Sequence, residues 1–259
     1  MSDKIKVIAP GEMLYPNTYV AVLDILGFKE LVERNSTEEL IKIYGKLKTT
    51  LMATTALYPK DKQKAEFPHL NIMDSLIISD TIIVWTPYST IVQFHGILNQ
   101  VSVFLKRAFF IGLPCRGCIT IGDLYISNQS ERLLYSRVEA LVAGKAIVEA
   151  YQIEKMFNWA GCVISETAYE TYRKKVEVQK KTDNSWWVKE IEKFIVKDYI
   201  VSTKKGFQTI KAVNWVRNPE KYDFTKEDFE QGFLQHKKTI NTPDVKEKIE
   251  NTWAFYQSL

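Results

Sequence analysis

Two aspartates stand where strand-forming runs meet a turn, at Asp24 and Asp80. Asp24 follows the apolar run 19–23 and precedes a turn through Gly27, whereas Asp80 has Ile- and Leu-rich stretches on both sides. A strand that is apolar along its length is buried on both faces, so an ionised carboxylate at its end is costly unless a cation meets it. If the strands bring the two acids together, their repulsion calls for a divalent metal ion, which carboxylate oxygens bind well.

Each acid also has a simpler interpretation. Asp is a common helix N-cap, so Asp24 could simply begin the helix that follows Gly27. Asp80 could be an ordinary hairpin-turn residue. The occurrence of both acids in the same setting favours a shared metal site over two unrelated structural roles.

Composition bounds the class of protein. With 259 residues, the chain can bury a sizeable core, and 46% hydrophobic with 25% charged residues is ordinary for a soluble globular protein. The 35 basic and 31 acidic residues give a formal charge of +4, too even for a nucleic-acid binder but compatible with an anionic small molecule. No apolar run approaches the ~20 residues of a membrane span, and the polar start does not resemble a signal peptide. We therefore expect a cytoplasmic protein that binds neither nucleic acid nor membrane.

Three cysteines, Cys115, Cys118 and Cys162, are too few for a disulfide framework. Cys115 and Cys118 have the spacing of a metal or redox motif, but no second pair or histidine cluster accompanies them. We interpret them as small strand residues, on opposite faces because side chains alternate along a strand.

The pattern of apolar residues and chain breakers predicts an α+β protein. Residues 1–17 are expected to form an irregular arm, 18–217 the main domain and 218–259 a mainly helical extension. Strands are predicted over about 18–23, 70–85 (a hairpin turning at Ser79-Asp80), 115–126, 161–164 and 207–215, and helices over about 27–34, 37–57, 90–111, 139–157 and 165–174. The order β-α-β-β-α-β indicates a ferredoxin-like core, with helices covering one face of a mainly antiparallel sheet.

Four segments carry a pattern known from one family. They are Leu23-Asp24-Ile25-Leu26-Gly27-Phe28, Ser79-Asp80-Thr81, Arg116-Gly117-Cys118-Ile119-Thr120-Ile121-Gly122-Asp123, and residues 144–154. Together they resemble the class III nucleotidyl cyclases, the catalytic domains of adenylate and guanylate cyclases. The resemblance covers about residues 18–215, and it is closest to the stand-alone pyrimidine cyclases of the Pycsar antiphage systems.

The resemblance implies a homodimer with active sites at its interface. Asp24 and Asp80 would hold two Mn²⁺ or Mg²⁺ ions, with the backbone carbonyl of Ile25 as a further ligand. A two-metal clamp activates the ribose 3′-hydroxyl and neutralises the pyrophosphate leaving group. The turn at Gly27 and Phe28 opens a helix, whose free N–H groups would cradle the triphosphate.

The chain departs from purine cyclases at the positions that read the base. A lysine four residues before the second aspartate is replaced by Leu76, and an acid three residues before the helix glycine is replaced by Leu141. The family also has an asparagine and an arginine, four and eight residues after that glycine, which stabilise the ribose and the transition state. An ungapped count places Val148 and Gln152 at these positions. The substitutions fit a pyrimidine substrate or an enzyme that has lost turnover.

Either another residue supplies the positive charge that Gln152 lacks, or turnover is weak. Arg116 is one candidate, since its guanidinium suits phosphate oxygens, and Lys145 is another. Arg116 could instead be a surface strand cation in an ion pair, and Lys145 a solvated surface lysine. Tyr44 is a candidate for stacking on the pyrimidine, although it lies on the apolar face of its helix and could be core. Phe28 could likewise be a core residue.

These considerations favour a metal-dependent cyclase that converts UTP or CTP into the 3′,5′-cyclic monophosphate and pyrophosphate. By the resemblance, the product would be a second messenger of antiphage defence, read by a separate effector. One alternative is a degenerate cyclase-fold module that binds nucleotide or a partner without turnover. Another is an unrelated metal-dependent phosphohydrolase.

Overall fold

The computed structural model describes residues 5–9, 11–55, 73–127, 141–180, 186–203, 206–216 and 224–259. In chain order its elements are β1 (Lys6–Ala9), β2 (Glu12–Ile25), α1 (Phe28–Arg34), α2 (Thr37–Thr55), β3 (Asp74–Ile78), β4 (Thr81–Trp85), α3 (Ile91–Phe110), β5 (Cys115–Ser127), β6 (Leu141–Ala143), α4 (Lys145–Glu154), β7 (Gly161–Ile164), α5 (Glu166–Lys180), α6 (Trp186–Glu192), β8 (Ile195–Thr203), β9 (Gly206–Val213), α7 (Lys226–Leu234) and α8 (Pro243–Gln257).

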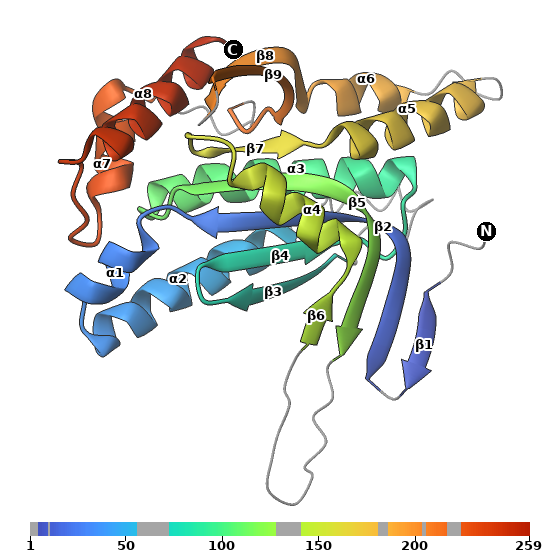
Figure 1. Ribbon diagram of the computed structural model, residues 1–259, viewed down its shortest axis with the longest axis horizontal. Helices are drawn as coiled ribbons and strands as arrows, with labels where there is room; N and C mark the ends of the chain where they lie inside the picture. The colour runs from blue at the N-terminus through green and yellow to red at the C-terminus, as the bar shows by residue number, and fades with distance from the viewer. Residues whose placement is uncertain are drawn as a thin grey trace, which may run out of the picture.

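A single sheet organises the described part of the chain (Figure 1). Its main path runs β3-β4-β2-β5-β7-β9-β8, with β1 on β2 and β6 on β5. Every pairing is antiparallel except β5 with β7. The segment from β2 to β5 has the ferredoxin-like order, because β3, β4, β2 and β5 lie side by side and α1, α2 and α3 form the two connections. The predicted α+β class and mainly antiparallel sheet are confirmed.

Strand β2 lies at the centre of this core, between β4 and β5. All residues from Tyr19 to Leu23 are at most 1% exposed, as the uninterrupted apolar run predicted. Tyr19 packs against Phe94 of α3, with ring centroids 4.9 Å apart. On the opposite face, the Thr120 hydroxyl of β5 donates to the carbonyl of Ala146 in α4.

Helices therefore cover both faces of the sheet, and the expectation of a single covered face was wrong. Figure 1 shows α4 crossing β2 and β5 on the face opposite to α2 and α3. The physical reason is the composition of β2 and β5, since strands that are apolar on both faces need a cover on each side. α4 supplies the second cover with Ala146 and Ala150, both fully buried.

Several elements differ from the sequence-based expectation: the helix expected over 165–174 extends to Lys180, and α6 and β8 were not predicted. The irregular arm expected over 1–17 contains β1 and the first half of β2, interrupted by a register shift between Tyr15 and Thr18 where Asn17 has a φ of 51°. The helix expected over 139–157 begins only at Lys145, because the preceding residues pair with β5 as β6. Residues 56–57, 70–72 and 139–140 of the predicted elements lie outside the described part of the chain.

The C-terminal helices complete the core. Phe255 of α8 contacts Trp159 and Tyr199, with ring centroids 4.6 and 4.9 Å apart, and Phe229 of α7 contacts Phe109 at 4.8 Å. Phe229 and Phe255 are both fully buried. The extension was correctly predicted to be mainly helical, and its hydrophobic core is continuous with that of the sheet.

Truncating Phe255 tests this continuity. We expect Phe255→Ala to lower the free energy of unfolding by about 3–5 kcal/mol, because a buried aromatic side chain leaves a cavity. Leu259→Ala, at a position 49% exposed, should change it by less than about 0.5 kcal/mol. Urea denaturation measures both, and a loss below about 1 kcal/mol for Phe255→Ala would show that α8 does not unfold with the sheet.

Candidate active site

Asp24 lies one residue before the end of β2, opposite Thr81 of β4 and Arg116 of β5. Because side chains alternate along a strand, Asp24 shares a face with Val22, the face that α4 covers. The central position of β2 thus gives this carboxylate neighbours on both flanking strands and on a helix. Its side chain is 20% exposed, so it is screened from solvent but reachable.

The β3–β4 turn brings Asp80 to the same end of β2. Ser79 and Asp80 form the turn, with Ser79 at a φ of 58°, and the backbone N–H of Ile25 donates to the Asp80 carbonyl at 3.0 Å. Burial raises the pKa of Asp24, Arg116 opposes this, and the Asp80 charge raises the pKa further. The two acids converge as the sequence analysis expected, and they repel one another.

Arg116 lies between two carboxylates. Its Nη2 is 3.1 Å from Asp24 Oδ2, its Nε is 2.7 Å from Glu154 Oε2, and its Nη1 donates to the carbonyl of Phe157 at 3.3 Å. The Arg116 side chain is only 14% exposed, so the surface location in its simpler interpretation was wrong, whereas the ion pairing was correct. Arg116 holds the Asp24 carboxylate in place.

Sequence reasoning missed Glu154, the last residue of α4, whose side chain is 1% exposed. In the sequence, Glu154 was included only as the last residue of the segment 144–154 that resembles the cyclases. Burial raises the pKa of Glu154 to about 7, with Arg116 opposing and Asp24 adding to the rise. Two carboxylates, Asp24 and Glu154, thus flank one guanidinium, and the charge of Asp80 acts on Asp24 from the β3–β4 turn. A further positive charge at this end of the sheet would stabilise the ionised forms of these acids.

The turn after Asp24 adopts a conformation that suits glycine. Gly27 has a φ of 76° and precedes α1, while the N–H of Leu26 donates to the carbonyl of Pro114 at 2.9 Å. Phe28 packs edge-on against Tyr44, with ring centroids 6.4 Å apart. The turn is therefore attached to the segment that enters β5.

Tyr44 supports the other turn. Its hydroxyl donates to the carbonyl of Ser79 at 2.8 Å, and burial, followed by the charge of Asp80, raises its pKa. The structure brings Tyr44 and Phe28 to the site as expected. Within one chain, the Tyr44 hydroxyl is hydrogen-bonded to the turn that carries Asp80.

Lys145 lies apart from the other candidates within one chain. Ala146, the next residue, is packed against Gly122, which pairs with Thr18 of β2. Asp24 is six residues further along that strand, about 20 Å away at roughly 3.3 Å per residue. Lys145 is exposed, and only from a second copy of the chain would it join this cluster.

A groove of about 420 Å³ adjoins Asp24 between α4 and the strands β2, β3 and β4. Its lining is mostly apolar: Val22, Ile78, Thr81, Ile83, Ile147, Val148, Tyr151 and Gln152. The volume lies in the range of small-molecule sites. Val148 and Gln152, which the sequence resemblance aligns with the cyclases' asparagine and arginine, both line this groove.

Comparison with solved structures identifies the fold. The guanylate cyclase domain of RhGC from Catenaria anguillulae in complex with GTP matches with a TM-score of 0.51 and 13% identity, over 78% of this chain and 97% of that domain. The chain has a guanylate cyclase catalytic-domain fold. The expected cyclase architecture is thereby confirmed.

Two further solved structures match less closely. One is a rhodopsin-guanylyl cyclase core with converted specificity in complex with ATPalphaS (TM-score 0.48, 13% identity, 79% of this chain and 98% of that one). The other is a dimeric guanylyl cyclase domain of the RhoGC fusion protein from Blastocladiella emersonii (TM-score 0.47, 12% identity, 82% and 97%). No protein-family profile matches the sequence, and no curated protein sequence matches it either.

Two negative findings concern only the described residues. None of their helices has the length and apolar character needed to cross a bilayer. They also contain no group of three or more His, Cys, Asp or Glu side chains that could hold a metal ion. A metal at Asp24 and Asp80 would therefore need ligands beyond acidic side chains.

Replacing Glu154 with Gln tests the charge balance of the cluster. The pKa of Glu154 is about 7 in the folded protein, against the ordinary value of 4.5. The protonated carboxyl therefore favours the folded state at low pH, and this part of the unfolding free energy is lost as the pH rises from about 4.5 to 7. Between pH 5 and 8 we expect the wild type to lose about 2 kcal/mol more unfolding free energy than Glu154→Gln. Urea denaturation in metal-free buffer measures this difference. The same pH dependence in both proteins would contradict the buried, partly protonated carboxyl.

Proposed function

We propose that the protein is a metal-dependent pyrimidine nucleotidyl cyclase that converts UTP or CTP into the 3′,5′-cyclic monophosphate and pyrophosphate. The observation that carries the proposal is the convergence of Asp24 and Asp80 at one end of the central strand of a cyclase fold. From the sequence resemblance, the product is a second messenger of antiphage defence in the cytoplasm, read by a separate effector.

The donor set suits two Mn²⁺ or Mg²⁺ ions. Asp24 and Asp80 offer hard carboxylate oxygens, and the carbonyl of Ile25, at the end of the same strand, is the proposed third ligand. Mg²⁺ is commonly bound by one or two carboxylates together with substrate phosphates, so the small number of acids here fits ions held jointly with a triphosphate. The ions would lower the pKa of the 3′-hydroxyl and neutralise the departing pyrophosphate.

The chain's own residues would orient the reaction. In cyclisation the 3′-oxygen loses its proton and bonds to the α-phosphorus. The bond between the α-phosphorus and the oxygen that bridges to the β-phosphorus breaks, and pyrophosphate leaves. Gly27 and Phe28 would lie along the triphosphate, and Arg116 would supply a fixed positive charge beside it. Lys145 is a second cation for this role if the partner's helix reaches the site.

A pyrimidine base fits the absence of purine-reading groups. Leu76 lies on β3 opposite Ile83 and packs on the core, and Leu141 lies on β6, so neither side chain offers a hydrogen bond to a base. Tyr44 remains the proposed stacking partner. The preference for UTP or CTP would follow from the few polar groups of the groove, Thr81 and Gln152 among them.

A second function has one specific observation in its favour. Val148 and Gln152, at the positions of the family's asparagine and arginine, carry no charge. A cyclase fold that binds a nucleotide or partner without turnover would tolerate that loss. Retention of both aspartates favours the enzyme, because two partly buried acids that repel one another are costly without a cation.

An assay with each of the four nucleoside triphosphates and Mn²⁺ separates these functions. We expect a cyclic pyrimidine monophosphate, identified by mass spectrometry, and at least a 100-fold loss of rate in Asp24→Asn and Asp80→Asn, because each variant removes a proposed metal ligand. Glu166→Gln, at an exposed site on α5, is the control and should keep the wild-type rate. Bound but unconverted nucleotide would favour the sensing module, and a linear monophosphate or diphosphate would contradict a cyclase.

We also propose a homodimer with interfacial sites. The groove beside Asp24 has an apolar rim, since Ile78, Val148 and Tyr151 are 49%, 56% and 44% exposed. Contiguous exposed apolar surface of this kind commonly marks an interface. A second copy placed there would bring its own α4 toward the two aspartates.

Val148→Asp tests the dimer. We expect sedimentation velocity to show a dimer for the wild type and a monomer for this variant, with cyclase activity reduced more than tenfold, because a buried unpaired carboxylate opposes association. Val178→Asp, on α5 and 70% exposed, should stay dimeric and active. A wild type that is an active monomer would contradict shared sites.

A further inference from the structure

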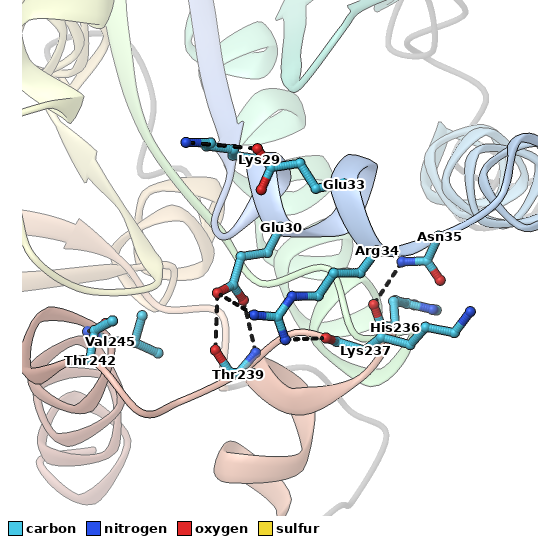
Figure 2. Close-up of polar contacts among 10 residues, drawn as sticks. All are labelled: Lys29, Glu30, Glu33, Arg34, Asn35, His236, Lys237, Thr239, Thr242 and Val245. Atoms are coloured by element: carbon cyan, nitrogen blue, oxygen red, sulfur yellow. Dashed lines mark hydrogen bonds and ion pairs between the residues drawn. The ribbon is translucent and has the colours of Figure 1, made fainter.

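The loop between α7 and α8 is attached to the helix that follows the candidate site (Figure 2). Thr239 donates its backbone N–H and its hydroxyl to the Glu30 carboxylate, at 2.8 and 3.0 Å. Arg34 donates to the carbonyl of Lys237 at 3.1 Å. The C-terminal extension is thus hydrogen-bonded to α1, far from it in sequence.

The same loop has an unfavourable backbone conformation. His236 and Lys237 have φ angles of 61° and 63°, a left-handed conformation that non-glycine residues rarely adopt in succession. Asn35 donates to the carbonyl of His236 at 2.8 Å, and the His236 ring lies 2.6 Å from the carbonyl of Ile111. Such backbone persists where the surroundings fix it, and here it directs the next residue, Lys238, inward.

Lys238 is only 5% exposed and joins two segments of the site. A Cβ on Gly27 would lie 3.0 Å from the Lys238 Cδ, so the lysine stem packs directly on the turn after Asp24. The Lys238 ammonium donates to the carbonyl of Gly112 at 2.8 Å. Gly112 begins the short connection from α3 into β5, which carries Arg116.

The burial of this charge calls for an explanation. Taking an ammonium out of water is costly, and an apolar side chain of the same length would fill the space at less cost. Burial lowers the pKa of Lys238 to about 8, with Cys115 and Glu30 opposing the fall, so the side chain remains mostly charged at neutral pH. Its ammonium provides what an apolar residue cannot, a hydrogen bond to the segment that leads into β5, while its stem packs on Gly27.

We propose that Lys238 is a positioning residue of the cyclase site. By joining Gly27 to Gly112, it holds the turn after Asp24 and the segment that leads to Arg116 in the relative position that the metal–nucleotide complex requires. This inference rests on the proposed function. It gives the C-terminal extension a part in nucleotide binding.

Lys238→Met in the full chain tests the proposal, because Met keeps a buried stem without the ammonium. Lys237→Met is the matched control: its side chain is 55% exposed and pairs with Glu39 at the surface. Without nucleotide, we expect the amides of residues 26–28 and 112–113 to exchange hydrogen at least tenfold faster in Lys238→Met. With Mn²⁺ and UTP or CTP, we expect its KM to rise at least fivefold while kcat changes less than twofold. Lys237→Met should stay within twofold of the wild type in all three quantities.

Unchanged exchange in folded Lys238→Met, or faster exchange with unchanged KM, would overturn the proposal. If Lys238→Met does not fold, Thr239→Val loosens the same loop from α1, and at least threefold faster exchange of the same amides, with a raised KM, is then the supporting result; its absence overturns the proposal. A wild type that converts no nucleotide would refute the proposed function itself. That outcome is distinct from an active wild type whose KM does not depend on Lys238.

Discussion

The repulsion between Asp24 and Asp80 is the constraint on which the rest of the site depends. Asp24 follows the fully buried residues 19–23 of β2, where water screens charge poorly, and the β3–β4 turn brings the half-buried Asp80 to the same strand end. The side chain of Arg116, on the neighbouring strand β5, forms ion pairs with Asp24 and with Glu154. The repulsion between Asp24 and Asp80 remains alongside these ion pairs, and a bound cation would relieve it.

The topology explains why these groups meet. β2 is central and antiparallel to β4 and β5, so its C-terminal end adjoins both the β3–β4 turn and the beginning of β5. The turn delivers Asp80, and β5 delivers Arg116. α4 crosses the same face and ends there with Glu154. Each group comes from a different element, and the sheet register fixes their relative position.

The sequence predicted the parts of this arrangement that have local signals. The apolar run before Asp24 and the breaker at Ser79-Asp80 identified the two strand ends, and the order of elements identified the fold. The start of α4 after Gly144 was missed, because Leu141 continued the helical spacing of apolar residues. Residues 141–143 instead pair with β5 as β6. An interruption of that kind depends on a partner strand, which periodicity does not report.

The residues that sequence reasoning missed act across long chain separations. Glu154 is an unremarked acid in an amphipathic helix until α4 packs on β5, and Lys238 is one of many lysines in a polar tail until its loop meets Gly27 and Gly112. Burial of a charged side chain reveals both, and burial depends on tertiary structure. The same holds for Lys145, whose distance from Asp24 follows only from the strand register.

The central claim is that Asp24 and Asp80 together hold divalent ions over a triphosphate. Titration of Mn²⁺, followed by electron paramagnetic resonance in the presence of the non-cyclisable analogue α,β-methylene-UTP, measures this directly. The account predicts two bound ions per site, and a loss of tight binding in both Asp24→Asn and Asp80→Asn. Unchanged Mn²⁺ binding in either variant, or none in the wild type with the analogue bound, would contradict it.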